Sequence, residues 1–347
     1  MQNTIKVNNK EYTILYQIGQ GAAGKVFKAQ YQNELYAIKK QEFFGEGELE
    51  FYDQLIQQKF KRCKNLIQIY DFEQIGRFSY IVMELGDSCL YNELIQNKID
   101  QKNIRFIIKQ IGSGIKELHE MGLAHRDLKP ENILIKTIFS NDKNESQQVF
   151  KICDFGVVKN ISNLKTKVVG TPYYLAPELL TNNNDYYSTK CDIWSFGILI
   201  YEILTRQLMF KGKTFQEISN AILSATDDYI SDQINQLKIE VDYKELLKNM
   251  LKVNSNQRYN IDQVLEALKP KSRSTSRQRQ NNFSMNPPPQ ISIRSQFQNR
   301  NNQLSQSPFK QIQNFNIIQQ QSIIQKPQQY QNKSQQNNLS NVRQLQF

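Results

Sequence analysis

The sequence predicts an α+β fold in two lobes, a small antiparallel sheet followed by a larger, mainly helical part, with a disordered tail at the end. Three observations predict it. Short β-type runs joined by turns fill the first part of the chain, helical periodicity dominates after Gly86, and the last part is rich in Gln, Asn and Ser. Successive hairpins favour an antiparallel sheet, and apolar residues recurring at three and four favour helices.

Charge separates the tail from the rest of the chain. The 347 residues carry 44 Lys and Arg against 33 Asp and Glu, a formal net charge of +11. From Lys269 onward there are 11 Lys and Arg and no Asp or Glu, so residues 1–268 hold 33 of each sign. The basic excess therefore belongs to the tail and says nothing about the folded part.

Residues 269–347 are expected to be disordered. Gln and Asn make up 32 of the last 77 residues, and such a composition buries too little apolar area to offset about 1 to 2 kcal/mol per residue of backbone ordering. The basic segment 269–279 is a candidate contact for an anionic partner, such as RNA, an acidic polymer or a membrane surface. The alternative is a solvated linker that carries phosphorylation sites.

The cysteines and the hydropathy of the sequence predict whether the protein lies inside the cell, outside it or in a membrane. The four cysteines, Cys63, Cys89, Cys153 and Cys191, are too widely spaced for a zinc site and too few for a disulfide scaffold. No signal peptide follows Met1, and the longest apolar stretch is too short for a membrane span of about 20 residues. We expect an intracellular protein, cytoplasmic or nuclear, with no transmembrane segment.

In the first lobe, short apolar runs alternate with turns. Strands are expected at residues 12–15, 25–30, 35–39, 66–71 and 79–83. One helix is predicted over residues 46–60, because Leu49, Tyr52, Leu55 and Ile56 recur at three and four.

The second lobe is mainly helical and ends near Leu268. Helices are expected at residues 90–96, 104–121, 177–180, 192–205, 214–224, 243–251 and 261–268. Two short strands are expected at residues 133–135 and 150–152, and the polar stretch 139–148 between them is predicted to be an extra surface loop.

The densest polar site is the octad His125-Arg126-Asp127-Leu128-Lys129-Pro130-Glu131-Asn132. It holds a candidate general base, two cations and a candidate metal ligand. Proline has no N–H donor and disfavours helix for the residue before it, so we expect a loop, with a strand beginning at Ile133. The octad resembles the catalytic loop of protein kinases of the Ser/Thr type.

A glycine-rich segment, Gly19-Gln20-Gly21-Ala22-Ala23-Gly24-Lys25-Val26, lies between two expected strands. Glycines let the backbone approach a polyphosphate and present N–H groups to it. A dinucleotide-binding fingerprint would instead open a helix. Thirteen residues past Val26, the strand Tyr36-Ala37-Ile38-Lys39 resembles the kinase V-A-I-K strand, although a lysine at a strand edge can also simply extend to solvent.

The resemblance implies roles for these residues in binding ATP. Lys39 is expected to contact the α and β phosphates and to be positioned by a glutamate on the following helix. Glu46, Glu48 and Glu50 are candidates, and we choose Glu48, with Glu50 second, because apolar residues follow Glu48 at the offsets usual in kinases.

Residues 81–86 resemble the hinge between kinase lobes, where backbone groups of Glu84 and Leu85 would bond the adenine edge. Met83 would limit the pocket, and Val26, Ala37 and Leu134 would enclose the ring, although each apolar residue alone is also consistent with core packing. The nucleotide-binding residues implied are Ile18, Gly19, Gly21, Gly24, Val26, Ala37, Lys39, Met83, Glu84, Leu85, Leu134 and Asp154.

The resemblance also implies the catalytic groups. Asp127 is the expected base that accepts the proton of the substrate hydroxyl, and Lys129 is expected to neutralise charge on the transferred phosphoryl group. Asn132 and Asp154, the latter in Asp154-Phe155-Gly156, are the expected Mg²⁺ ligands. A lysine at position 129 favours Ser and Thr over Tyr as acceptors.

Residues 156–178 resemble an activation segment. Thr171 would contact Asp127 and Lys129 and shape the substrate-binding floor. The usual phosphoacceptor position holds Lys167, so Thr166 is our candidate, with Ser162 second.

Three further expectations concern the scaffold of the second lobe. His125 is expected to pack under the Asp154-Phe155-Gly156 turn, and Asp192 to bond the backbone of the catalytic loop. Arg258 is expected to pair with Glu178.

The resemblance covers roughly residues 12–268 and predicts an enzyme, a protein serine/threonine kinase using ATP and Mg²⁺. We expect an N-terminal extension at 1–11, a protein-kinase-like bilobal domain at 12–268 and the tail at 269–347. Within the domain the first lobe is 12–83, the hinge 84–88 and the second lobe 89–268. The alternative is a pseudokinase that binds partners without catalysis; loss of Lys39, Asp127 or Asp154 would have favoured it, and all three are present.

Overall fold

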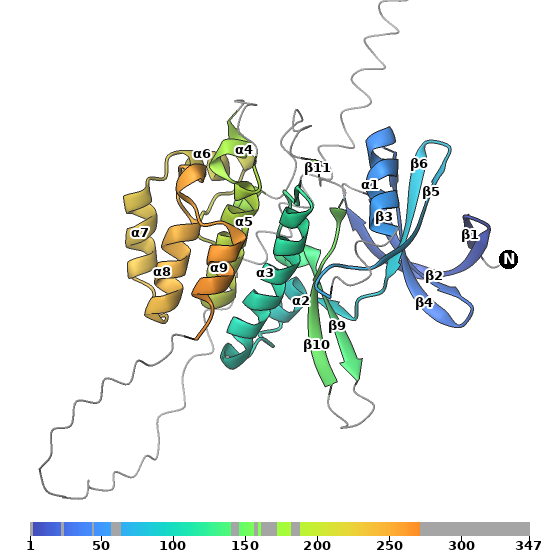
Figure 1. Cartoon of the computed structure of the whole chain (residues 1–347), viewed down its shortest axis with the longest axis horizontal. Coiled ribbons are helices and arrows are strands. Elements are labelled where there is room, and N and C mark those ends of the chain that lie inside the picture. The colour runs from blue at the N-terminus through green and yellow to red at the C-terminus, as the bar shows by residue number, and fades with distance from the viewer. Residues whose placement is uncertain are drawn as a thin grey trace, which may run out of the picture.

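The computed structural model describes residues 3–21, 24–43, 45–56, 64–139, 146–155, 159–160, 172–181 and 188–270. The side chains of residues 46–48, 50, 54, 159 and 160 lie outside that description. The described residues form two lobes, with the sheet of β1 to β6 and helix α1 on one side and helices α4 to α9 on the other (Figure 1). Helix α3 and the β9–β10 hairpin lie between them.

The first lobe is a six-stranded antiparallel sheet in the order β1-β2-β3-β4-β6-β5. Its strands are β1 (Thr4–Val7), β2 (Lys10–Gly21), β3 (Gly24–Tyr31), β4 (Glu34–Glu42), β5 (Ile69–Ile75) and β6 (Phe78–Glu84). Helix α1 (Glu46–Ile56) packs on β5. The strand β1, where the patterns predicted only an extension, pairs with β2 and belongs to the sheet.

The two faces of this sheet belong to separate apolar cores. Ile38 of β4 packs with Val7 and Tyr12, which the β1–β2 hairpin contributes. Ala37, its neighbour in the same strand, joins the main core together with Met83. Because successive strand residues point to opposite faces, the hairpin covers the face that is turned away from the second lobe.

The second lobe is built around helix α5, whose residues are buried on all sides. Its helices are α2 (Leu90–Ile95), α3 (Ile104–Glu120), α4 (Pro177–Leu180), α5 (Lys190–Thr205), α6 (Phe215–Leu223), α7 (Asp227–Asn235), α8 (Val241–Met250) and α9 (Ile261–Ala267). Trp194 and Phe196 of α5 are fully buried, as expected for a helix that is apolar all round.

Seven of these helices begin and end within two residues of the predicted bounds. Helix α7 was not predicted. It buries only Ile230 and Ile234, so its apolar pattern is weak. Its start is stabilised by Thr226, whose side chain accepts a hydrogen bond from the N–H of Tyr229.

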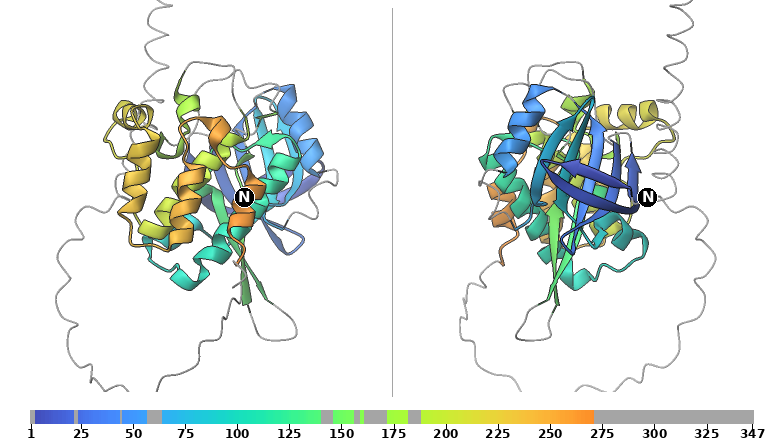
Figure 2. Two further views of the ribbon diagram at one scale, coloured as in Figure 1. Left: turned by 60° about the vertical axis from the view of Figure 1, so that its left-hand side comes forward. Right: turned by 90° about the vertical axis from the view of Figure 1, so that its right-hand side faces the viewer.

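The predicted surface loop at residues 139–148 is wrong in extent. Strands β9 (Ile133–Phe139) and β10 (Ser146–Ile152) pair along their whole length, from Ile133 with Ile152 to Phe139 with Ser146. The hairpin projects from the body of the domain (Figure 2). Backbone hydrogen bonds hold two projecting strands without apolar side chains, so the polar composition was a poor guide. Residues 140–145 lie outside the described residues.

Two other strand pairings complete the second lobe. Strand β7 (Ser88–Cys89) pairs with β9 in a three-stranded sheet of order β10-β9-β7, and β8 (Leu123–Ala124) pairs with β11 (Lys159–Asn160).

Two predicted boundaries in the first lobe differ. The strand expected at 66–71 begins only at Ile69, because Leu66 instead forms a parallel bridge with Ile152 of β10. Helix α1 is described as far as Ile56, and the rest of the predicted helix to residue 60 lies outside the described residues. In the described part of the chain, no helix is long and apolar enough to cross a membrane.

Candidate active site

The octad is a loop anchored on helix α5. Asp192, fully buried in the first turn of α5, accepts hydrogen bonds from the backbone N–H groups of His125 and Arg126, both at 2.8 Å. Nε2 of His119 lies 2.9 Å from the same carboxylate. Burial alone would raise the pKa of Asp192, but the hydrogen bond and charge of His119 outweigh burial and hold this pKa below its usual range. The predicted contact of Asp192 with the loop backbone is confirmed.

Arg126 has a backbone φ of 68°, a left-handed conformation that costs a non-glycine residue about 1 to 3 kcal/mol. The hydrogen bonds to Asp192 hold it in place. This turn at Arg126 leads from the fully buried His125 to Asp127.

The carboxylate of Asp127 is contacted by Lys129 and by Asn132. Nζ of Lys129 lies 2.7 Å from Oδ2 of Asp127. Nδ2 of Asn132 donates to the same oxygen at 3.0 Å and to the backbone oxygen of Asp127 at 2.8 Å. A 3-10 turn at Pro130–Asn132 brings Asn132 back to Asp127, and β9 begins at the next residue, as predicted. The carboxylate is therefore fixed in orientation by two donors.

A second carboxylate, Asp154, pairs with Lys39. Their Nζ and Oδ1 atoms are 2.5 Å apart, and the two side chains are 7% and 27% exposed. Burial raises the pKa of Asp154, but the charge and hydrogen bond of Lys39 outweigh burial, so this pKa is lowered. Asp154 is therefore ionised at neutral pH, as a metal ligand must be. It also has a positive φ, 64°.

Asn132 and Asp154 suit Mg²⁺, which takes oxygen ligands. Because Nδ2 of Asn132 points to Asp127, its Oδ1 faces the other way. Within the described residues, no group of three or more His, Cys, Asp and Glu side chains gathers as a metal site. A pair of oxygen ligands is nevertheless what Mg²⁺ needs in a phosphate site, since this ion keeps waters and substrate phosphates as its other ligands.

The predicted adenine-pocket residues all join the main apolar core. Ala37 and Met83 are buried in it, and Val26, Leu85 and Leu134 pack against it. Met83 stands opposite Ala37 across strands β6 and β4. Beyond the end of β6, a Cβ placed on Gly86 would lie 3.1 Å from Cβ of Leu134, so the hinge runs against the second lobe.

The glycine-rich segment forms the β2–β3 hairpin. Gly19 stands opposite Val26 and Gly21 opposite Gly24, while residues 22–23 lie outside the described residues. Gly24 has a φ of 129°, and a Cβ there would collide with the backbone oxygen of Lys40. Only glycine fits at this position. Ile18 lies in β2 and is 44% exposed.

Several predicted residues cannot be placed. Glu48 lies in α1, but its side chain, like those of Glu46 and Glu50, is outside the described part, so its pairing with Lys39 stays a prediction. Thr171, Thr166 and Ser162 also lie outside the described residues.

Comparison with known proteins agrees with this geometry. The family model described as "Protein kinase domain" matches residues 12–268. This chain belongs to the eukaryotic-type Ser/Thr protein kinase family.

The curated relatives include three calcium-dependent protein kinases from two Plasmodium species. Calcium-dependent protein kinase 4 of Plasmodium berghei (strain Anka) is 32% identical over 77% of this chain and 50% of its own length. Calcium-dependent protein kinases 5 and 4 of Plasmodium falciparum (isolate 3D7) are each 31% identical over 77% of this chain, and over 47% and 50% of their own lengths. The chain spans about half the length of these relatives.

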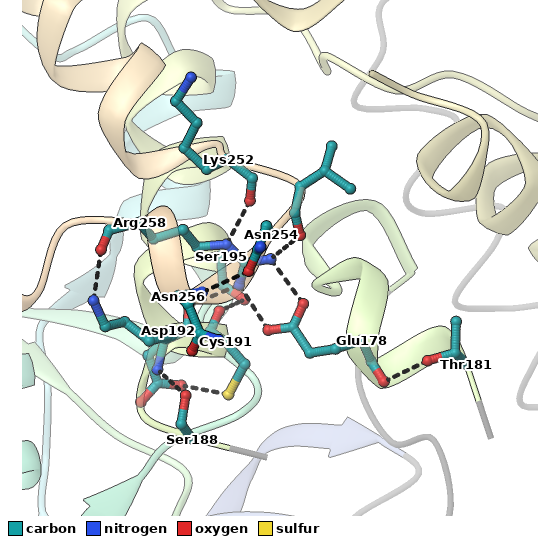
Figure 3. Close-up of polar contacts among 12 residues, drawn as sticks. Glu178, Thr181, Ser188, Cys191, Asp192, Ser195, Lys252, Asn254, Asn256 and Arg258 are labelled. Carbon is teal, nitrogen blue, oxygen red and sulfur yellow. Dashed lines mark hydrogen bonds and ion pairs between the residues drawn. The ribbon is translucent and has the colours of Figure 1, made fainter. Parts of the chain in front are cut away.

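The scaffold of the kinase domain carries two confirmed contacts. His125 is fully buried, with Nε2 2.9 Å from the backbone oxygen of Cys153 and its ring 6.0 Å from that of Phe155. Arg258 forms a two-pronged pair with Glu178, at 2.6 Å and 2.8 Å (Figure 3). Its guanidinium also lies over the ring of Trp194, 5.0 Å from the centroid.

The patterns missed the chemical environment of two acids, one in helix α5 and one in the octad. Glu202 of α5 is 1% exposed, and burial raises its pKa to about 8. Its Oε2 accepts a hydrogen bond from the Tyr174 hydroxyl at 2.6 Å. Burial also raises the pKa of Glu131. The signal was present in the sequence, since Glu202 stands alone in an apolar helical run.

Proposed function

We propose that this kinase domain transfers the γ-phosphoryl group of ATP to Ser and Thr hydroxyls of protein substrates, with Mg²⁺. The observation that carries the proposal is the set of contacts among Lys39, Asp154, Asp127, Lys129 and Asn132. These residues come from strand β4, the octad and the segment directly after β10. Such a set of fixed charges is what phosphoryl transfer requires, because its catalysis is mostly positioning and electrostatics.

Asp127 is the proposed base. Its carboxylate is held by Lys129 and Asn132, so it can accept the proton of the substrate hydroxyl while orienting the oxygen for in-line attack. Burial lowers the pKa of Lys129, but the charges of Asp127 and Glu131 more than compensate, and the pKa of Lys129 is raised overall. Lys129 therefore stays charged and stabilises the transferred group.

Lys39, Asn132 and Asp154 are proposed to hold the phosphates and the metal. Lys39 contacts the α and β phosphates, and Glu48 is the proposed partner that positions it. Asn132 and Asp154 are the ligands of Mg²⁺, which when bound neutralises phosphate charge and draws the phosphate oxygens into line.

The adenine ring of ATP is proposed to bind among the apolar side chains of Val26, Ala37, Met83 and Leu134. Backbone groups of Glu84 and Leu85 bond the adenine edge. Apolar walls with a few polar groups are the usual composition of such pockets. The glycine-rich hairpin, with Ile18, Gly19, Gly21 and Gly24, covers the phosphates.

Activation is proposed to involve the segment before Pro172. Thr171 is proposed to contact Asp127 and Lys129, and a phosphate on Thr166, or on Ser162, to pair with Arg126. A phosphopeptide map that lacks both sites would remove this part of the proposal.

The basic tail from Lys269 onward, which contains no Asp or Glu, is proposed to contact an anionic partner inside the cell. Truncation after Pro270 that left binding to RNA and anionic vesicles unchanged would exclude that role.

The kinase proposal is tested by transfer of labelled γ-phosphate to matched peptides that differ only in Ser, Thr or Tyr at the acceptor. The full chain is expected to label the Ser and Thr peptides, with labelling lost on chelation of Mg²⁺ and in Asp127→Asn. No transfer after any activating treatment would favour a pseudokinase instead. Labelling of the Tyr peptide alone would contradict the acceptor class.

A further inference from the structure

A lysine outside the active site is buried three residues before Asp154. Nζ of Lys151, on β10, lies 2.9 Å from Oε2 of Glu84, and the two side chains are 11% and 15% exposed. Glu84 is the last residue of β6, where the hinge begins. The backbone of Glu84 belongs to the proposed adenine site, while its side chain reaches into the second lobe.

The same carboxylate also holds the segment that precedes β5. The N–H of Gln68 donates to Oε2 of Glu84 at 3.3 Å, and the N–H of Glu84 donates to the backbone oxygen of Gln68 at 2.9 Å. Nζ of Lys151 lies 3.5 Å from the backbone oxygen of Leu66. One buried ion pair thus joins the hinge, residues 66–68 and β10.

Residues 65–67 are themselves fixed to the second lobe. The N–H of Ile67 donates to the oxygen of Ile152, and the N–H of Ile152 donates to the oxygen of Asn65, both at 2.9 Å. Nδ2 of Asn65 donates to the oxygen of Phe150 at 2.8 Å. Helix α3 packs closely against this segment, since a Cβ on Gly114 would lie 2.6 Å from the backbone oxygen of Asn65.

We propose that Glu84 and Lys151 are positioning residues for the nucleotide, which set the place of the hinge backbone relative to Asp154. From Lys151 the chain needs only three residues to reach Asp154, so the pair connects the adenine end of the site to its metal end over a short, rigid path. Loss of the pair frees the hinge and weakens binding of the adenine part. The inference rests on the proposed function, because it assumes that the hinge binds adenine.

A salt bridge elsewhere in the lobe provides a matched control. Lys252 and Asp227 are 3.2 Å apart, and their side chains are 29% and 33% exposed. This pair lies between the end of α8 and the start of α7, in contact with none of the hinge residues named above. Lys252→Met therefore removes a lysine charge and an ion pair without touching the connection.

The test is calorimetric binding of ADP and of adenosine to the full chain. Lys151→Met and Glu84→Gln are each expected to lower both affinities about tenfold, Lys151→Arg to restore most of the loss, and Lys252→Met to leave both unchanged. The double variant is expected to lose no more than either single one, since both act through one contact.

Each single variant leaves one buried charge without its partner, which can prevent folding. The double variant removes both charges and therefore provides a second measurement. If the single variants do not fold, a folded double variant is expected to bind ADP about tenfold more weakly than the parent chain. Unchanged affinity in the folded variants, with only a lower melting temperature, would show that the pair is merely structural and overturn the inference. If the parent chain binds ADP but transfers no phosphate, the proposed function fails while the effect on binding still decides this inference.

Discussion

Two ion pairs in this kinase domain join distant parts of the chain in opposite ways. Lys39 and Asp154 meet through one nitrogen and one oxygen. Arg258 and Glu178 meet through two parallel bonds, and the other N–H groups of Arg258 donate to the backbone oxygens of Lys252, Val253 and Lys190. A guanidinium has five donors, and in this pair all five are used.

We propose that the difference separates a contact that stabilises the fold from a contact that serves a ligand. Arg258 is fully buried and completely bonded, so the pair has no capacity left for another molecule. Lys39 has three donors and makes one bond within the described part of the chain. Asp154 keeps 27% of its side chain exposed. The Arg258–Glu178 pair is therefore closed, whereas the Lys39–Asp154 pair is open in the sense that its proposed contacts with phosphates and Mg²⁺ require.

The largest expected effect is on catalysis. Asp154→Asn should lower the rate of phosphate transfer about 10³-fold, the upper range for removing one preorganised electrostatic contact, because the amide lacks the charge that holds Mg²⁺. The melting temperature should fall less than in Glu178→Ala, since the side chain of Asp154 is 27% exposed and the amide keeps an oxygen that can accept from Lys39. Steady-state kinetics and thermal denaturation check both parts. A variant that keeps the parent rate would contradict the assignment of Asp154.

For the pair of Arg258 and Glu178, the larger effect is expected on stability instead of on catalysis. Glu178→Ala should lower the free energy of unfolding by about 3 to 5 kcal/mol, because it leaves Arg258 buried without its counter-ion. Urea denaturation measures this, with Glu178→Gln as a milder variant that keeps a hydrogen-bond acceptor. A loss below about 1 kcal/mol would show that the pair is not the structural contact described above.

The carboxylate of Glu202 can be compared with those of Asp154 and Glu178. Its hydrogen-bond partner is the hydroxyl of Tyr174 instead of a cation. Its pKa is raised to about 8, so the folded protein keeps a proton that the unfolded chain releases above its usual pKa. Stability should therefore fall as pH rises from about 4.5 to about 8, by at most roughly 1.4 kcal/mol per pH unit from this group.

Glu202→Gln removes this titration and keeps an acceptor for the Tyr174 hydroxyl. Its unfolding free energy relative to the parent chain should rise with pH across that window. Equal slopes for the parent chain and Glu202→Gln, in urea titrations at several pH values, would contradict the raised pKa.

The smallest effect is expected for an exposed pair. Lys252→Ala should lower stability by no more than about 1 kcal/mol, because the ion pair with Asp227 is partly solvated. Urea denaturation in low and high salt checks this. A loss as large as that of Glu178→Ala would erase the distinction between open and closed pairs.

The sequence was most informative where a motif carries the chemistry. The octad, Lys39 and Asp154 were recognised from residue type and order, and the structure brings Asp127, Lys129 and Asn132 together. Helices were predicted well because their apolar faces are regular over many residues.

Pairings between distant residues could not be read from spacing. The contact of Lys151 with Glu84 joins residues on different strands, and no local pattern selects this lysine or this glutamate. Strand β1 is only four residues long and depends on a turn in which Asn8 and Asn9 both have positive φ. Asparagine tolerates that conformation, so the turn was a signal that the short length of the strand concealed.

The most direct test of the account is a comparison of the full chain with its Asp127→Asn variant, in which nucleotide binding and phosphate transfer are measured on the same preparations. Asp127 contacts Lys129 and Asn132 and has no proposed role in holding the nucleotide, so the variant should bind ATP with Mg²⁺ within about threefold of the parent affinity. Its rate of transfer to a Ser peptide should fall by about 10²-fold or more. Equal transfer rates in the two proteins would contradict the central claim that Asp127 is the base of this site.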